Sequence, residues 1–276
     1  MVKKIAWAAL ILSLAGVTAQ APPPAPKPAG SPKSAARPNF DTFEVATIKP
    51  VVPGAKSNRY LTMQGTNRFV GKNYTLKLLI AAAYDLNSRT ILGGPAWIEF
   101  DHFDVQALTP GDIRPTHDEQ MLMLRALLAD RFNLKFHREQ KVFSIYELEI
   151  AKGGPRLKQS TAPADDPAAL ISIVYPQHLL LPARNATMAD FVSLLQRAIL
   201  DRPVVDKTGL TGKYDFDLKW APDESQFGGE APVVPAESPA APLFSAIQDQ
   251  LGLRLIATRG PVDAFVVDKA EQPSAN

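Results

Sequence analysis

The side chains in this sequence best suited to acid–base or metal chemistry are its histidines and carboxylates. The four histidines are His102, His117, His137 and His178. No two of them stand four residues apart, the spacing at which one helix face presents two zinc ligands. A zinc site would therefore need the fold to gather distant histidines and carboxylates. We expect solvated or hydrogen-bonded histidines and predict no metal site.

Four aspartates, Asp101, Asp104, Asp215 and Asp217, are the most suggestive carboxylates. Alternation along a strand places Asp215 and Asp217 on one face, roughly 6–7 Å apart. Paired acids about 5–9 Å apart can hydrolyse glycosides. The intervening residues are apolar, however, so a solvated strand face explains the same pattern. Asp215 is kept as a weak binding candidate.

Motifs for nucleophilic or phosphate chemistry are missing from the sequence. It contains no G-x-S-x-G elbow, no P-loop and no G-x-G-x-x-G. The two glycines of residues 208–212 indicate a tight turn, or alternatively a loop that binds a ligand through backbone amides. Asp206 and Thr208 are candidates on that second interpretation. We predict no catalytic residue and no cofactor.

Two further binding candidates are Trp97 and His137. Trp97 follows Gly93-Gly94-Pro95 and is expected either to anchor this loop or to recognise a ligand. His137 belongs to a basic cluster that spans residues 135–141, for which a solvated face is the simpler explanation.

The N-terminus has the pattern of a secretory signal peptide over residues 1–21. A basic start at Lys3 and Lys4 precedes the apolar residues 5–17 and the cleavage motif Ala19-Gln20-Ala21. The chain of 276 residues has a net charge of +2, which these two lysines account for, and no cysteine. Disulfides and a lipid-anchored cysteine are therefore excluded. We expect an exported protein, periplasmic or extracellular, with no membrane span after cleavage and no nucleic-acid partner.

Proline-rich segments divide the rest of the chain. Residues 22–40 form a Pro/Ala-rich tether, residues 41–152 a first half, residues 153–177 a linker and residues 178–276 a second half. A Pro-rich loop at residues 222–242 interrupts the second half.

The two halves have similar patterns. A helix is predicted at residues 75–84 with Thr75 as its cap, and another after Thr187, 112 residues further on. Alternating strands follow, in which Phe103-Asp104 matches Phe216-Asp217 at an offset of 113.

The ends of the halves match as well. Residues 127–136 align with 246–255 at an offset of 119, with Asn133 and Gly252 at left-handed helix caps. Turns at residues 138–141 and 258–261 then predict two hairpins. We predict an α+β fold of two related strand-helix-strand-helix-hairpin halves, with antiparallel sheets, helices packed on one face and an internal duplication.

Several motifs in the chain occur together, among them Gly93-Gly94-Pro95-Ala96-Trp97, Leu127-Leu128-Ala129-Asp130-Arg131-Phe132 and Val204-Val205-Asp206-Lys207-Thr208-Gly209. Together they resemble an uncharacterised exported family, the domain of unknown function 3738 of Solibacter-type hypothetical proteins, which is expanded in acidobacteria. The resemblance covers roughly residues 40 to 276 and supplies no activity. Related domains attached to membrane-bound metallopeptidase sensors imply periplasmic sensing or binding, although this chain has no H-E-x-x-H. The helix-then-hairpin pattern also resembles small N-terminal domains of secretins and TonB-dependent receptors.

Two functions follow as expectations. The first is a non-enzymatic binding or protein-interaction module of the cell envelope, sensor-like, whose partner is another envelope protein or a small ligand. The alternative is a hydrolase in which the fold alone brings together carboxylates and His137, and this would need Asp101 or Asp215 within about 3 Å of a histidine.

Overall fold

The computed structural model describes residues 37–52, 54, 58–163, 165–235 and 237–273. The predicted signal peptide and most of the predicted tether lie outside these residues. Residues from 37 onward form one compact unit. Helices and largely antiparallel sheets confirm the predicted α+β fold.

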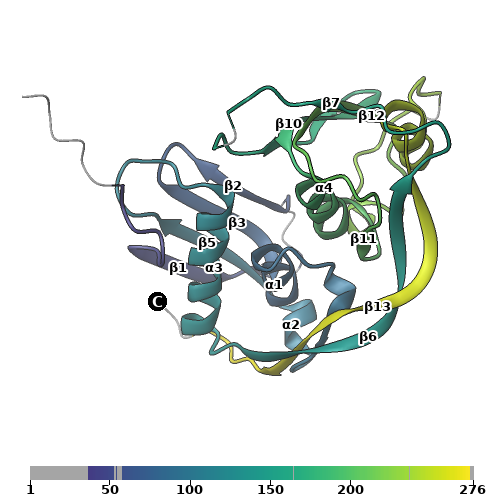
Figure 1. The fold of residues 1–276 in the computed structure, drawn as a ribbon. Helices are drawn as coiled ribbons and strands as arrows, with labels where there is room; N and C mark the ends of the chain where they lie inside the picture. The colour runs from purple at the N-terminus through teal and green to yellow at the C-terminus, as the bar shows by residue number, and fades with distance from the viewer. Residues whose placement is uncertain (1–36, 53, 55–57, 164, 236, 274–276) are drawn as a thin grey trace, which may run out of the picture. The chain divides into compact units, whose positions relative to one another are not determined.

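The first half is a four-stranded antiparallel sheet with helices across one face (Figure 1). Its spatial order is β1-β5-β3-β2. Alternate residues of the strands, such as Phe69 and Val105, pack under the helices to form a first hydrophobic core. The elements are β1 (Val45–Pro50), β2 (Tyr60–Gln64), β3 (Arg68–Thr75), α1 (Leu76–Ala83), η1 (Ser88–Thr90), β4 (Ile91–Gly93), α2 (Trp97–Phe100), β5 (His102–Leu108) and α3 (His117–Arg131).

The second half has its own antiparallel sheet, centred on the pair of β10 and β12, and a second core that includes Phe191 and Trp220. Two of its helices continue as π-helical turns, η2 and η4. The elements are β7 (Lys158–Gln159), β8 (Ala169–Leu170), β9 (Ile173–Tyr175), β10 (His178–Ala186), α4 (Met188–Leu194), η2 (Leu195–Ile199), β11 (Val204–Asp206), β12 (Tyr214–Trp220), η3 (Phe227–Gly229), α5 (Leu243–Ala246) and η4 (Ile247–Leu251).

Helices α1 and α4 begin where the sequence predicts. The Thr75 hydroxyl accepts the backbone N–H of Leu78, and the Thr187 hydroxyl accepts that of Asp190 in a capping box. The predicted left-handed caps are confirmed too, because Asn133 has a φ of 45° and Gly252 a φ of 65°.

A strand bulge precedes each of these two helices. Asn73 and Asn185 have φ values of 57° and 51°. The backbone N–H of Asn73 donates to Asp104 Oδ1 at 3.0 Å, and that of Asn185 donates to Asp215 Oδ1 at 2.9 Å. The structural counterpart of Asp104 is therefore Asp215, so the sequence alignment of Asp104 with Asp217 is two residues out of register.

The two predicted hairpins are wrong. The residues predicted to turn lie inside two continuous strands, β6 (Lys135–Ile150) and β13 (Leu253–Lys269), which pair with each other in antiparallel register. Neither predicted turn contains a residue with positive φ, which a two-residue hairpin turn requires. Figure 1 shows the pair as one long curved ribbon that runs beside both halves.

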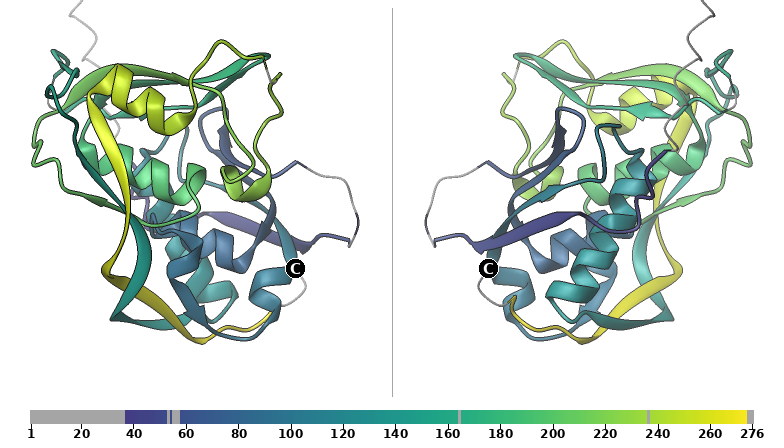
Figure 2. Two further views of the ribbon diagram at one scale, coloured as in Figure 1. Left: turned by 90° about the vertical axis from the view of Figure 1, so that its right-hand side faces the viewer. Right: turned by 90° about the vertical axis from the view of Figure 1, so that its left-hand side faces the viewer.

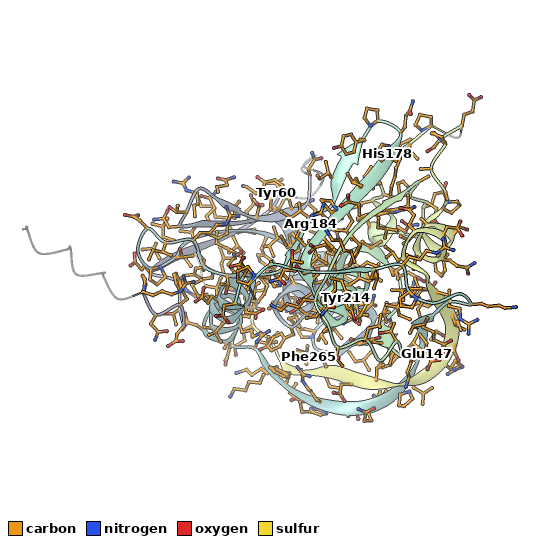
Figure 3. All side chains as sticks on the ribbon, turned by 45° about the horizontal axis from the view of Figure 1, so that its top comes forward. Tyr60, Glu147, His178, Arg184, Tyr214 and Phe265 are labelled. Atoms are coloured by element: carbon orange, nitrogen blue, oxygen red, sulfur yellow. The ribbon has the colours of Figure 1, made fainter. Side chains whose placement is uncertain are left out.

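Each long strand ends in the core of the other half. Phe265 of β13 is 1% exposed in the first core, where its ring stacks on Phe136 with centroids 3.8 Å apart. Leu148 of β6 is fully buried in the second core. Figure 2 shows β13, in yellow, passing from the last helices of the second half to the first, and in Figure 3 Phe265 and Glu147 mark the two ends of the ribbon.

Two short parallel strands complete the ribbon at opposite ends. β4 pairs with β13 from Phe265 onward, and β11 pairs with β6 from Tyr146 onward. In the middle, Val142 pairs with Pro261, 119 residues further along the chain, which is the offset of the aligned helix ends. Similar elements thus occupy similar places in both halves, while their origin by duplication stays a prediction.

Candidate ligand-binding cleft

The two halves meet where the loop after α1 lies against the helical segment formed by α4 and η2. Asn87 of this loop is 4% exposed. Its Nδ2 donates to the carbonyl oxygens of Gln196, at 2.7 Å, and Leu200, at 3.1 Å, and its Oδ1 accepts the backbone N–H of Arg89 at 3.0 Å. Because buried polar groups are costly when unpaired, this satisfied amide fixes the loop against the end of η2.

Asp85 links the same loop to α4, η2 and α3. Its Oδ1 lies 2.9 Å from Ser193 Oγ, 3.3 Å from Arg197 Nε and 3.5 Å from His117 Nε2. Burial favours the neutral carboxyl, but His117, Arg197 and Ser193 outweigh burial, so that the pKa of Asp85 is lowered. Ser193 donates its proton to a carboxylate rather than to a histidine, which differs from the arrangement that activates a serine nucleophile.

A cleft of about 970 Å³ lies beside this junction and is bounded by both halves. The first half contributes β2, β3, α1 and α3, and the second contributes β9, η2 and the loop after β12. This volume and the mixture of polar and apolar groups are typical of a small-molecule site. The residues that matter most below are Arg59, Tyr74, Val174, Arg197, Phe227 and Glu230.

Three polar side chains line the cleft near one another: Arg59, just before β2, Tyr74 of β3 and Arg197 of η2. Arg59 Cζ lies 6.0 Å from the centroid of the Tyr74 ring. Tyr74 is partly buried. Burial raises the pKa of its hydroxyl, while Arg59 and Arg197 act to lower this pKa. The Nε of Arg197 is buried beside Asp85, while the residue as a whole lines the cleft. Arg59, Tyr74 and Arg197 therefore present polar donor groups to the cleft.

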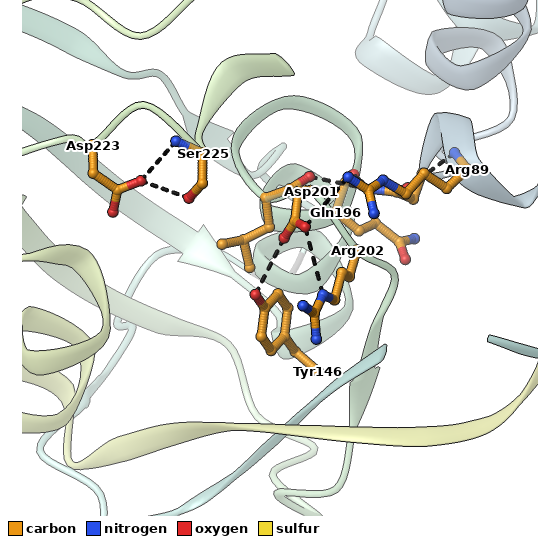
Figure 4. Close-up of polar contacts among 9 residues, drawn as sticks. Arg89, Tyr146, Gln196, Asp201, Arg202, Asp223 and Ser225 are labelled. Carbon is orange, nitrogen blue, oxygen red and sulfur yellow. Dashed lines mark hydrogen bonds and ion pairs between the residues drawn. The ribbon is translucent and has the colours of Figure 1, made fainter. Parts of the chain in front are cut away.

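A second part of the cleft lining is the loop after β12, which lies within the predicted Pro-rich loop and contacts Arg59. Its anchor is Gln226, which is fully buried and accepts the indole N–H of Trp220 at 2.9 Å. Gln226 also donates to Asp223 Oδ2. The other carboxylate oxygen of Asp223 accepts from Ser225 (Figure 4). This part of the lining is thus tied to the second core by hydrogen bonds.

Asp201 stands at the rim of the cleft between the two halves. Its carboxylate accepts the Tyr146 hydroxyl at 3.1 Å and lies 3.5 Å from both Arg89 Nη2 and Arg202 Nε (Figure 4). The Arg202 guanidinium also lies over the Tyr146 ring, 5.2 Å from its centroid. Asp201 is therefore held by residues from both halves.

Two of the candidates from sequence lie away from the cleft. Trp97 packs against the first core, with ring centroids 6.2 Å from Phe103 and 6.4 Å from Phe132. His137 lies on an exposed part of β6, where its Nδ1 is 2.8 Å from Asp268 Oδ1. The structure brings neither side chain near the other candidates.

The remaining three candidates hold turns and bulges. Asp206 Oδ1 accepts the Thr208 hydroxyl at 2.7 Å and the Thr208 backbone N–H at 2.8 Å, as in an Asx turn. Asp215 accepts the backbone N–H of Asn185, and this bond lowers its pKa against the opposing effect of burial. Asp206 and Thr208 adjoin each other, while Asp215 belongs to a different strand.

The other histidines are also dispersed. His102 Nδ1 lies 3.1 Å from the Asn73 carbonyl oxygen, and the His178 ring stacks on Tyr175 with centroids 4.9 Å apart. Among the described residues, no three histidine or acidic side chains are grouped as metal ligands. In this same part of the chain, every helix is too short or too polar to cross a membrane.

Sequence reasoning missed Arg59, Tyr74 and Arg197. Tyr74 lies inside the Asn73-Tyr74-Thr75 segment that predicts the helix start, but nothing in that pattern marks its hydroxyl. Arg197 continues the helical pattern after Thr187, and Arg59 precedes β2. Only the placement of the two halves brings these residues together.

The fold and cleft define an α+β protein with a ligand-sized cavity between two interlocked halves. The chain belongs to the family described as Protein of unknown function (DUF3738), whose model matches residues 77–270. No curated protein and no solved structure matches the chain.

Proposed function

We propose that this protein is a non-enzymatic binding module that holds a small ligand in the cleft between its halves. The observation that carries the proposal is the cleft itself, whose walls come from both halves and present donors such as Tyr74 and Arg197. The proposal includes export through the signal peptide at residues 1–21, action in the cell envelope or outside it, and kinship with the Solibacter-type members of the family.

A sensor-like role follows from the way the halves are joined. A ligand that contacts both walls would change the free energy of association of the two halves. The junction at Asn87 and the ion pairs of Asp85 and Asp201 are the contacts on which this change would act. Binding by the cleft could thus be reported to another envelope protein.

No observation favours the hydrolase alternative. Asp101 Oδ2 accepts an amide hydrogen from Gln272, and Asp215 accepts a backbone N–H. The alternative needs Asp101 or Asp215 beside a histidine, but the carboxylate that contacts His137 is that of Asp268. Ser193 gives its hydrogen bond to Asp85.

A ligand screen with a blocked cleft tests the binding function. Ala82 lines the cleft, so Ala82→Trp fills part of it. Leu122→Trp, at a position 44% exposed on α3 and outside the cleft lining, is the matched control. Compounds found by thermal shift with the purified protein should stabilise the control and lose their effect on Ala82→Trp. If compounds bind both variants equally, or none binds the wild type, the cleft is not a binding site.

A further inference from the structure

The donors in the cleft have few acceptors among the described residues. Arg59 uses only its Nη2 atom, which lies 3.1 Å from the Phe227 carbonyl oxygen and 3.0 Å from Glu230 Oε2. The buried Nε of Arg197 forms an ion pair with Asp85 Oδ1 at 3.3 Å, and no other contact of this guanidinium is found among the described residues. The Nε and Nη1 groups of Arg59 and the Nη groups of Arg197 are therefore available to a ligand.

The Tyr74 hydroxyl belongs to the same group. No hydrogen bond of this hydroxyl is found among the described residues, although the side chain is partly buried. The charges that act on it are those of Arg59, Arg197 and Glu230, so it lies in the electrostatic field of both guanidinium groups. Two guanidinium groups and a phenol together form a set of hydrogen-bond donors for oxyanions.

Apolar side chains lie beside these donors. Phe69, Val174, Leu179 and Phe227 line the cleft from both halves. A ligand that fills this cavity therefore needs an apolar body as well as a charged group. A free inorganic ion would leave the apolar wall uncovered.

Glu230 occupies the place that such a charged group would take. Its carboxylate pairs with Arg59 from the loop after β12, and its side chain is 60% exposed. An exposed ion pair of this kind contributes little to stability and can open readily. The carboxylate of Glu230 therefore stands in for the oxyanion of a ligand.

We infer that the cleft binds a ligand with an apolar body and a carboxylate or phosphate group, which Arg59, Arg197 and Tyr74 hold. Glu230 is its internal competitor for Arg59. This inference rests on the proposed binding function and names the chemical class of the ligand. Binding exchanges one carboxylate for another at Arg59 and adds new bonds at Arg197 and Tyr74.

Calorimetric titration of the purified full chain with phenylacetate, phenyl phosphate and neutral phenylacetamide tests the inference. One or both anions should bind at least ~10-fold more tightly than the amide, because charge-assisted hydrogen bonds are about twice as strong as neutral ones. Arg197→Gln and Arg59→Gln should each weaken anion binding by ~10-fold. Glu230→Gln should strengthen it by ~3-fold or more, and the two anions separate a carboxylate site from a phosphate site.

Arg184→Gln is the control, because Arg184 lies on β10 outside the cleft lining and forms an exposed ion pair with Asp217 of β12. It should leave all three affinities unchanged. As an independent readout, anion binding should shift the NMR resonances of the Nε–H groups of Arg59 and Arg197 in the wild type, and not that of Arg184.

Three results would overturn the inference. Equal binding of the amide and the anions, or anion binding that survives both Arg59→Gln and Arg197→Gln in folded protein, removes the oxyanion site while leaving a binding cleft in place. Absence of binding by all three probes at millimolar concentration also removes it. Weaker binding after Glu230→Gln removes the competitor role. Failure of the proposed function is recognised separately, by the insensitivity of every screened compound to Ala82→Trp.

Discussion

The amide of Asn87 offers the sharpest test of how the halves are joined. Asn87→Ala removes two hydrogen bonds donated to carbonyl oxygens and one accepted from a backbone N–H, all in a side chain that is 4% exposed. Each lost bond costs about 0.5–1.5 kcal/mol, and each buried group left unpaired adds to that cost. We expect the free energy of unfolding to fall by about 2–4 kcal/mol.

The matched control is Gln250→Ala. Gln250 also uses its amide to pair with a backbone N–H and carbonyl, those of Lys219, at 2.9 and 2.7 Å. Because that site is open to solvent, water replaces the lost bonds, and the expected cost is less than about 1 kcal/mol. Urea unfolding, followed by both circular dichroism and tryptophan fluorescence, measures both variants and shows whether the halves still unfold together.

Equal losses for the two variants would refute the reasoning. Such a result would mean that water reaches the carbonyl oxygens of Gln196 and Leu200 without cost. The junction would then be a wet contact and not a closed one.

Three further predictions use other parts of the structure. The pKa of Asp85 is lowered in the folded protein, so its ionised form stabilises the fold above about pH 4. This contribution is lost as the pH falls through the folded pKa. Asp85→Asn should therefore flatten the acid side of a plot of unfolding free energy against pH. Gly209→Ala should lower the free energy of unfolding by only about 1–2 kcal/mol, because the added Cβ would point into open space and the cost is that of the left-handed backbone, with a φ of 68°. Gly252→Ala should cost more, because a Cβ there overlaps the carbonyl oxygen of a neighbouring loop. Gln226→Leu leaves the buried Trp220 indole N–H unpaired and should lower stability by about 1–3 kcal/mol, with a red shift of tryptophan fluorescence as the loop loosens.

Local features of this fold were predictable from sequence. The caps at Thr75 and Thr187 depend on residues within one helical turn, and the left-handed positions of Asn133 and Gly252 depend on their own backbones. The α+β class follows because the 3.6- and 2-residue periods that reveal helices and strands are local properties too.

The path of the long ribbon was not predictable in the same way. Its middle is two-stranded and exposed, because β4 and β11 pair only near its ends. Polar residues and Pro261 are tolerated there, since no third strand needs their outer edge. Those same residues resemble turns in the sequence. The cleft residues could not be predicted from sequence for a related reason: Arg59 and Arg197 are brought together only by packing of distant segments.

The crossing of β6 and β13 has a consequence for the order in which the chain can fold. The first core contains Phe265 and Val267, which are synthesised long after its other buried residues, the last of which is Leu134. The N-terminal half therefore emerges with an incomplete core and must wait for the C-terminal strand before it can close. Contacts between such distant positions slow folding. The same exchange of strands would let two copies trade their β13 strands, so concentrated refolding is the condition in which entwined dimers should form.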